Sequence, residues 1–386
     1  MRLDQIKSRF VNIFGHGDIH SFHSPGRVNL IGEHTDYNGG YVLPCALTLG
    51  TYGVLKKRQD NVLRLASVNF GSEPVEISLA AVAYNKNHRW VNYLLGVVAE
   101  FKKLGVNLQG MDMLISGNVS SNAGLSSSAS IELLMAAALN ELFNCNIPTI
   151  ELVKLCQRAE NLFVGVNCGV MDQFVVGMAK RDNAILLNCL DLEYDYIPVL
   201  LKEHSLVISN TNSPRSLVDS KYNERCSECE NAVKMLKAGM NIEFLGQITA
   251  KEFEENKYLI SCSTALKRAE HVVYEIDRTK EAALKLSQGD LKSFGKLMND
   301  SHDSLKNLYE VTGFALDTMV FEARKLKGVL GSRMTGAGFG GCTVSLVEDK
   351  YVEDFIGNVR RTYKAKTGIA PDFYIAGIGE GVVRVD

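Results

Sequence analysis

Gly117-Asn-Val-Ser-Ser-Asn-Ala-Gly-Leu-Ser-Ser-Ser-Ala-Ser130 joins a strand pattern to a helix pattern through small residues, and this junction decides how the first half of the chain folds. Residues 111–116 alternate as a strand, whereas residues 131–143 are rich in Ala and Leu and predict a helix. The first-turn N–H groups of a helix have no intrahelical acceptors, and together with the helix dipole they favour an anion such as phosphate. Gly124 lets the backbone approach a ligand closely, and the hydroxyls of residues 126–128 can bind phosphate oxygens or a cation.

A serine-capped helix that follows a flexible loop is the alternative interpretation of the same stretch. Capping requires one hydroxyl, whereas this segment offers three in succession beside Gly and Ala, which favours phosphate binding. The chain contains no Gly-x-x-x-x-Gly-Lys-Ser/Thr motif, so the segment is not a P-loop. Charge neutralisation of a triphosphate would therefore come from Mg²⁺ and from side chains elsewhere.

Length and composition indicate two domains and exclude several functions. With 386 residues, 46% hydrophobic and 22% charged, the chain can bury a large core. A net charge of -2 favours neither nucleic acid nor an anionic membrane as a partner. Nine cysteines without disulfide spacing and an N-terminus without an apolar segment predict a cytoplasmic location. Cys226 and Cys229 are the one close pair, which we interpret as ordinary thiols rather than zinc ligands because no second pair exists.

A polar loop with two carboxylates and an imidazole, Glu33-His34-Thr35-Asp36, follows a short strand pattern that begins at Arg27. Ionised carboxylates accept strong hydrogen bonds from neighbouring hydroxyls, which suits sugar binding. A metal site and a solvated turn capped by Asp are alternative interpretations of the loop. Arg27 favours a ligand site, because an arginine that leads into such a loop can be directed toward an anion.

Asp172 stands among apolar neighbours in the segment 165–177. An aspartate at a helix start, stabilised by the helix dipole, is one interpretation. A catalytic base is the other, and a base in apolar surroundings needs a nearby cation to stay ionised. The pattern alone leaves both interpretations open.

The order of helix and strand patterns places a domain boundary near residue 195, after which the pattern is mostly helical. Residues 191–202 are expected to form a connector. The predicted helices cover residues 1–14, 80–101, 131–143, 149–161, 219–238, 265–288, 290–308, 316–325 and 352–366. The predicted strands cover residues 27–31, 41–56, 62–79, 111–116, 185–190, 205–210, 343–348 and 372–377.

A second glycine cluster occupies residues 331–341. It superficially matches the dinucleotide-binding fingerprint, but a strand pattern at residues 342–347 follows where that fingerprint requires a helix. We therefore predict no dinucleotide site. The glycines are expected to let a backbone turn approach a nucleotide, or the first loop, across a domain interface.

Three motifs, Ser24–Asp36, Ala123–Ala129 and Met334–Gly341, together closely resemble the galactokinases of the GHMP kinase superfamily, and the resemblance spans essentially the whole chain. The Gly-Glu-His-Thr-Asp-Tyr segment is specific to galactokinase-like members. The resemblance implies a mixed α/β and α+β fold with two domains, residues 1–195 and 196–386, and an active site in the cleft between them.

The same resemblance implies roles for individual residues. Asp172 would be the base at the anomeric hydroxyl of the sugar, and Arg27 the cation that stabilises Asp172 and the transferring phosphoryl group. Galactose would be bound by Glu33, His34, Thr35, Asp36 and Tyr222. The ATP phosphates would be bound by Asn122, Ala123, Gly124, Leu125, Ser126, Ser127 and Ser128, with Ser67 touching the nucleotide. Mg²⁺ would be bound by Ser128 and Glu160.

The implied reaction transfers the γ-phosphoryl group of ATP to the C1 hydroxyl of D-galactose in a monomer or weak homo-oligomer. Two departures from the family pattern are Asn122, where a smaller residue is usual, and Cys226, where a second Arg is usual. A kinase for the N-acetyl sugar is an alternative within the same class. A sugar- and ATP-binding regulator without catalysis is another, although it would be expected to have lost the serine loop or the base, and both are present here.

Overall fold

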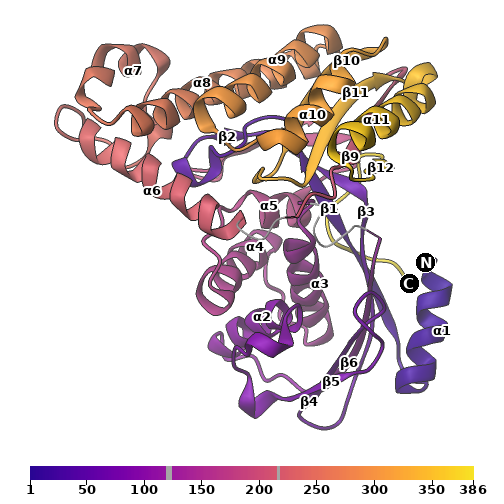
Figure 1. The fold of residues 1–386 in the computed structure, drawn as a ribbon. Coiled ribbons are helices and arrows are strands. Elements are labelled where there is room, and N and C mark those ends of the chain that lie inside the picture. The colour runs from indigo at the N-terminus through magenta and orange to yellow at the C-terminus, as the bar shows by residue number, and fades with distance from the viewer. Residues whose placement is uncertain (119–123, 215–217) are drawn as a thin grey trace.

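The computed structural model describes residues 1–118, 124–214 and 218–386. The first domain occupies the lower part of Figure 1 and is built on a six-stranded sheet with the order β13-β1-β3-β6-β4-β5. Neighbouring strands are antiparallel except β4 and β6, which are parallel. The strands are β1 (His20–Asn29), β3 (Pro44–Lys57), β4 (Val62–Ser67), β5 (Val75–Ser78), β6 (Met111–Gly117) and β13 (Val383–Arg384).

Helices cover both faces of this sheet. Successive residues of β3 point to opposite faces, so Leu55 packs in the large core with α2 to α5, whereas Val54 packs against α1. Figure 1 shows α1 on one side of the sheet and the other helices opposite. These helices are α1 (Leu3–Phe14), α2 (Val91–Lys103), α3 (Ser127–Leu142), α4 (Thr149–Arg158) and α5 (Met171–Met178).

The second domain is built on an antiparallel sheet with the order β10-β11-β9-β12. Val207 of β9 packs with α10 and α11, whereas its neighbour Ile208 faces a core that also contains Val28 and Leu30 of the first domain. One hydrophobic core therefore spans both domains and fixes how they meet. The strands are β9 (His204–Asn210), β10 (Val329–Thr335), β11 (Cys342–Glu348) and β12 (Asp372–Ile375). The helices are α6 (Val218–Leu236), α7 (Ala250–Asn256), α8 (Ser263–Ser287), α9 (Leu291–Ser304), α10 (Gly313–Arg324) and α11 (Val352–Thr367).

A small third sheet, β2-β7-β8, lies where the chain passes from one domain to the other. Its strands are β2 (Tyr41–Val42), β7 (Asn183–Asn188) and β8 (Tyr194–Pro198). The expected connector at residues 191–202 is wrong at β8, which is partly exposed and therefore lacks a hydrophobic alternation. The domain boundary near residue 195 falls within this strand and stays a prediction.

Most of the predicted elements are confirmed, and the errors have local causes. The helix expected from residue 80 begins only at Val91. Two hydrogen bonds to Asn85 stabilise a nonhelical turn before it: Asn87 N donates to Asn85 Oδ1 at 3.0 Å, and Asn92 Nδ2 donates to the Asn85 carbonyl at 2.8 Å. β10 was not predicted, since a glycine-rich strand carries little periodicity. The helix expected to end at residue 161 changes at Ala159 into a π-helical segment, η4 (Ala159–Val164). Among the described helices, none has both the length and the apolar character needed to cross a bilayer.

Candidate active site

A bidentate ion pair joins the first strand to helix α5. Arg27 Nε donates to Asp172 Oδ1 at 2.8 Å and its Nη2 donates to Oδ2 at 2.9 Å, and Ser126 Oγ also donates to Oδ2. The third guanidinium nitrogen, Nη1, donates to the carbonyl of Gly124 at 2.7 Å. Arg27 is only 5% exposed, whereas the Asp172 side chain keeps 27% exposure. The pair therefore holds Asp172 in one orientation and leaves it accessible to a ligand.

A cavity of about 230 Å³ lies beside this pair, between the two domains. The first domain contributes carboxylates, and the second contributes Tyr222 and Asn223 of α6 and the backbone of the glycine-rich turn after β10. This arrangement shows a cavity in the interdomain cleft, where the active site is predicted. The lining includes Arg27, Glu33, His34, Asp36, Glu160, Gly169, Asp172, Tyr222, Gly336 and Ala337.

Contacts from the second domain hold the acidic loop of residues 33–36. Glu33 forms an ion pair with the fully buried Arg333, and its Oε1 accepts from Gly336 N at 2.9 Å. Burial raises the pKa of Glu33, while the Arg333 charge opposes that change. Thr35 does not line the cavity, because its hydroxyl lies 2.9 Å from Gly32 O and 2.7 Å from Tyr41 O inside the loop. The loop is therefore shaped as much by the second domain as by its own sequence.

His34 is neutral, and its hydrogen-bond partners determine which ring nitrogen carries the hydrogen. Burial, followed by the effect of His271, lowers its pKa to about 3. Its Nε2 lies 3.2 Å from the carbonyl of Ala337, which can only accept, so Nε2 carries the hydrogen. Nδ1 must then accept from the Tyr37 hydroxyl at 2.9 Å, and the Tyr37 oxygen accepts from Tyr309 at 2.7 Å. The Ala337 carbonyl of the second domain thus determines which atoms donate along the series His34, Tyr37 and Tyr309.

Asp36 is the carboxylate of the loop that has no Lys, Arg or His ion-pair partner among the residues that the structure describes. Burial, and then the charge of Asp172, raise its pKa to about 6. Its carboxylate rests against Gly169, where an added Cβ would lie 2.0 Å from Asp36 Oδ2. Asp36 therefore needs glycine at position 169 in order to face the cavity beside Asp172.

The serine segment begins helix α3, as predicted, although the helix starts at Ser127 rather than at residue 131. Ser126 adopts a left-handed backbone conformation with φ 58°, which turns the chain sharply into the helix. Leu125 is buried, and its carbonyl accepts from Arg27 N at 3.1 Å. Asn122 and Ala123 lie outside the described residues, so their predicted roles stay predictions.

Ser128 and Glu160 come together, and two further buried residues join them. Glu160 accepts from the Ser128 hydroxyl and, through Oε2, from Gln173 Nε2 at 2.6 Å. Gln173 Nε2 also lies 3.1 Å from Glu132 Oε2. Burial, and then Asp172, raise the pKa of Glu160 to about 7, and burial and Glu160 raise that of Glu132 well above its usual range.

These donors fit a magnesium ion. Carboxylate and hydroxyl oxygens are its preferred protein ligands, and Mg²⁺ commonly keeps waters and substrate phosphates as its remaining ligands. Within the described ranges, no three His, Cys, Asp or Glu side chains converge on one metal position. A divalent cation would also offset the unfavourable burial of the Glu160 carboxylate, which has no Lys or Arg partner among the ion pairs of the described residues.

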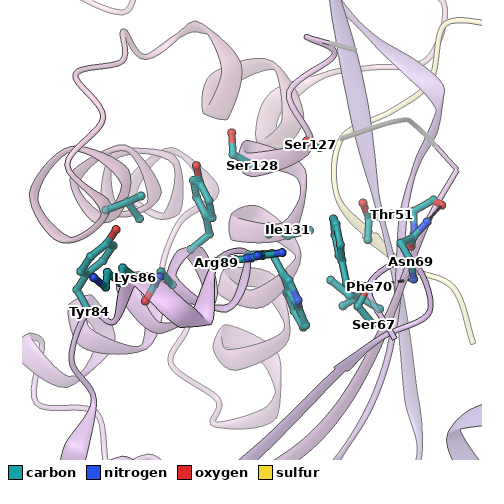
Figure 2. A pocket seen from close by; sticks show the side chains of 16 residues that line it. Thr51, Ser67, Asn69, Phe70, Tyr84, Lys86, Arg89, Ser127, Ser128 and Ile131 are labelled. Carbon is teal, nitrogen blue, oxygen red and sulfur yellow. Dashed lines mark hydrogen bonds between the residues drawn. The ribbon is translucent and has the colours of Figure 1, made fainter. Parts of the chain in front are cut away.

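A second, larger pocket of about 700 Å³ opens on the other side of Ser127 and Ser128. Figure 2 shows Ser127 and Ser128 above this pocket, with Tyr84 and Lys86 on one side and Phe70 on the other. The rings of Phe70 and Trp90 are stacked at 15° with centroids 6.3 Å apart. Ser67, at the end of β4, lines the same pocket, and its contact with a nucleotide stays a prediction. The two serines thus lie between an aromatic pocket and the carboxylate-lined cavity.

Comparisons with known proteins agree with this geometry. A galactokinase galactose-binding signature matches residues 8–57, and the N-terminal and C-terminal domain models of the GHMP kinases match residues 92–180 and 279–365. The galactokinase of Clostridium acetobutylicum is 52% identical over 386 residues, covering 100% of this chain and 99% of that protein. The chain belongs to the galactokinase family.

A second galactokinase sequence and a solved galactokinase structure are also similar to this chain. The galactokinase of Fusobacterium nucleatum is 53% identical over 387 residues, covering 99% of this chain and 100% of that protein. The crystal structure of Lactococcus lactis galactokinase complexed with galactose has a TM-score of 0.96 at 44% identity, and it covers 99% of this chain and 100% of that chain. Membership in the galactokinase family makes the chain an ATP-dependent sugar kinase and confirms the predicted fold and enzyme class.

Sequence reasoning missed several residues that shape the site. Arg333 stands in the second glycine motif, but nothing in the sequence shows that it reaches Glu33. Glu132 was detectable, because it follows Ser128 by four residues on a helix and therefore shares its face. Gln173 adjoins Asp172 in the sequence, yet its contact with Glu160 depends on the π-helical turn of η4.

Asp36→Asn is expected to raise the unfolding midpoint of the ligand-free protein by about 2 °C at about pH 8. Folding raises the pKa of Asp36 from 3.8 to about 6, so the ionised carboxylate destabilises the folded state above pH 6. The gain should shrink as the pH falls through 6 and vanish below about 4, where Asp36 is protonated in both states.

Scanning calorimetry across this pH range measures the effect. Asp277→Asn, at an exposed position of α8, is the matched control and should leave the midpoint unchanged. A stabilisation by Asp36→Asn that does not depend on pH would contradict the raised pKa.

Proposed function

We propose that this protein transfers the γ-phosphoryl group of ATP to the C1 hydroxyl of D-galactose, which yields galactose 1-phosphate and ADP. The observation that carries the proposal is the placement of Asp172. It is held by Arg27 and Ser126 at the point where the carboxylate-lined cavity meets the start of helix α3. A base at this point can reach a hydroxyl in the cavity and face a phosphoryl group at the helix N-terminus.

The cavity supports a polar sugar as its ligand. Asp36 offers carboxylate oxygens that accept from sugar hydroxyls, and Tyr222 and His34 contribute aromatic surface at a ring centroid separation of 5.7 Å. Glu33 and His34 line the same cavity, and their contacts with Arg333 and Ala337 hold them in place. We assign Thr35 to the internal bonding of the loop rather than to direct sugar contact.

The larger pocket supports ATP as the phosphoryl donor. Its volume of about 700 Å³ suits an adenosine group, and the stacked Phe70 and Trp90 offer flat aromatic surface for a base. The triphosphate would then lie along residues 124–128, where the first-turn N–H groups of helix α3, which have no intrahelical acceptors, and serine hydroxyls can bind it. Ser128 and Glu160 would hold Mg²⁺, which when bound neutralises phosphate charge.

The chain's own residues would act by positioning and by charge. Phosphoryl transfer proceeds through a loose transition state with charge on the equatorial oxygens, so oriented donors and cations provide most of the rate enhancement. Arg27 fixes the Asp172 carboxylate and places its guanidinium near the phosphate segment through Gly124. Asp172 orients the C1 hydroxyl and accepts its proton.

A coupled ADP-release assay across hexoses that differ at C2, C4 and C6 tests the function. D-Galactose should support turnover, and glucose, its C4 epimer, should support far less. ADP release that does not depend on an added sugar would overturn the proposal. Faster turnover with N-acetylgalactosamine than with galactose would instead favour the kinase for the N-acetyl sugar.

Asp172→Asn is expected to lower turnover by about 10²–10⁴-fold, because it removes the general base. Galactose affinity, measured by calorimetry, should stay within about threefold of the wild-type value, since Asn keeps a hydrogen-bonding side chain at this position. The retained affinity is the internal control for a folded site. Turnover close to that of the wild type would remove Asp172 from the mechanism.

Gly169→Ala is expected to lower kcat/KM for galactose by roughly 10–100-fold, because the added methyl group would displace the Asp36 carboxylate. Gly357→Ala, on helix α11, is the matched control because its Cβ would meet nothing within 4 Å. Steady-state kinetics and unfolding midpoints of both variants provide the comparison. Equal kinetics for the two variants would show that Asp36 does not need its observed position.

A further inference from the structure

Three buried side chains from three separate elements meet beside Asp172. Glu132 comes from α3, Glu160 from η4 and Gln173 from α5, and they are 0%, 5% and 0% exposed. The Gln173 amide nitrogen lies 2.6 Å from Glu160 Oε2 and 3.1 Å from Glu132 Oε2. One amide group therefore bridges two carboxylates, and we call these three residues the Glu–Gln–Glu cluster.

The cluster is costly for the fold taken alone. Helix α3 is otherwise apolar around position 132, where Ile131, Leu133 and Leu134 are buried in the main core. Two neighbouring carboxyl groups inside such a core cannot both be ionised without a large cost unless they are paired or bind a cation. Among the ion pairs of the described residues, neither Glu132 nor Glu160 has a Lys or Arg partner. Glu132 Oε1 and Gln173 Oε1 also have no hydrogen-bond partner there.

The position of the cluster connects it with both halves of the reaction. Ser128 and Glu132 are four residues apart on α3 and therefore share one helix face. Gln173, which contacts Glu160, directly follows Asp172, the proposed base, on α5. The π-helical turn of η4 presents Glu160 to both helices, and such turns occur frequently at functional sites.

We propose that Gln173, supported by Glu132, is a positioning residue that orients the Glu160 carboxylate for the magnesium ion of the nucleotide complex. This inference rests on the proposed magnesium site at Ser128 and Glu160. Gln173 Nε2 donates to Glu160 Oε2 at 2.6 Å. The other carboxylate oxygen of Glu160, Oε1, is not bonded to this amide. Outer contacts of this kind fix the orientation of metal ligands and typically change metal affinity by about 10–100-fold when removed.

The test is Gln173→Met, which keeps the volume of the side chain and removes the amide donor. Binding of Mn²⁺ with ADP, followed by electron paramagnetic resonance, should weaken by about 10–100-fold. Galactose affinity without nucleotide, and ADP affinity in the presence of a chelator, should stay within about threefold of the wild type, since neither depends on the metal. Gln157→Met is the matched control, because Gln157 lies on the neighbouring α4 and donates to the Cys168 carbonyl at 3.4 Å rather than to a carboxylate.

A second pair of variants keeps the test decisive if Gln173→Met does not fold. Glu132→Leu should weaken Mn²⁺·ADP binding, whereas Glu132→Gln, which can still form hydrogen bonds, should restore most of it. Wild-type Mn²⁺·ADP affinity in Gln173→Met or in Glu132→Leu would overturn the inference.

Glu160→Gln separates this inference from the proposed magnesium site on which it rests. If Glu160→Gln weakens Mn²⁺·ADP binding and Gln173→Met does not, the magnesium site stands and the positioning role fails. If Glu160→Gln binds Mn²⁺·ADP as the wild type does, the magnesium site itself is wrong.

Discussion

The bidentate ion pair between Arg27 and Asp172 is the interaction on which the rest of the site depends. It links β1 to α5, and through Gly124 it also holds the turn that leads into helix α3. A buried guanidinium without its carboxylate would be strongly unfavourable, so the pair constrains both elements together. The carboxylate-lined cavity, residues 124–128 and Asp172 are consequently held in fixed positions relative to one another.

The second domain completes what the first domain begins. Arg333 and Gly336 bind Glu33, Ala337 sets the tautomer of His34, and Tyr222 closes the cavity. The core that contains Val28 and Ile208 joins the two sheets behind this site. Because these contacts cross the domain interface, the acidic loop has its observed shape only when the domains are docked. Binding geometry and domain packing are therefore two consequences of the same contacts.

Local sequence patterns predicted much of this molecule. The strand of residues 111–116, the helix after the serines and the cleft location all follow from periodicity and from the resemblance to galactokinases. Contacts between distant segments were beyond such patterns, since Gly169 meets Asp36 and Arg333 meets Glu33 only after folding. Strand β8 was missed because it is exposed, and η4 because a single wide turn leaves no periodic signal.

The most direct test is a crystal structure with D-galactose and a nonhydrolysable ATP analogue. The C1 hydroxyl should lie within hydrogen-bond distance, about 2.6–3.2 Å, of an Asp172 carboxylate oxygen. The γ-phosphate should lie over residues 124–128, with the adenine ring near Phe70 and Trp90. A galactose whose C1 hydroxyl points away from Asp172, or a nucleotide bound outside the larger pocket, would contradict the account.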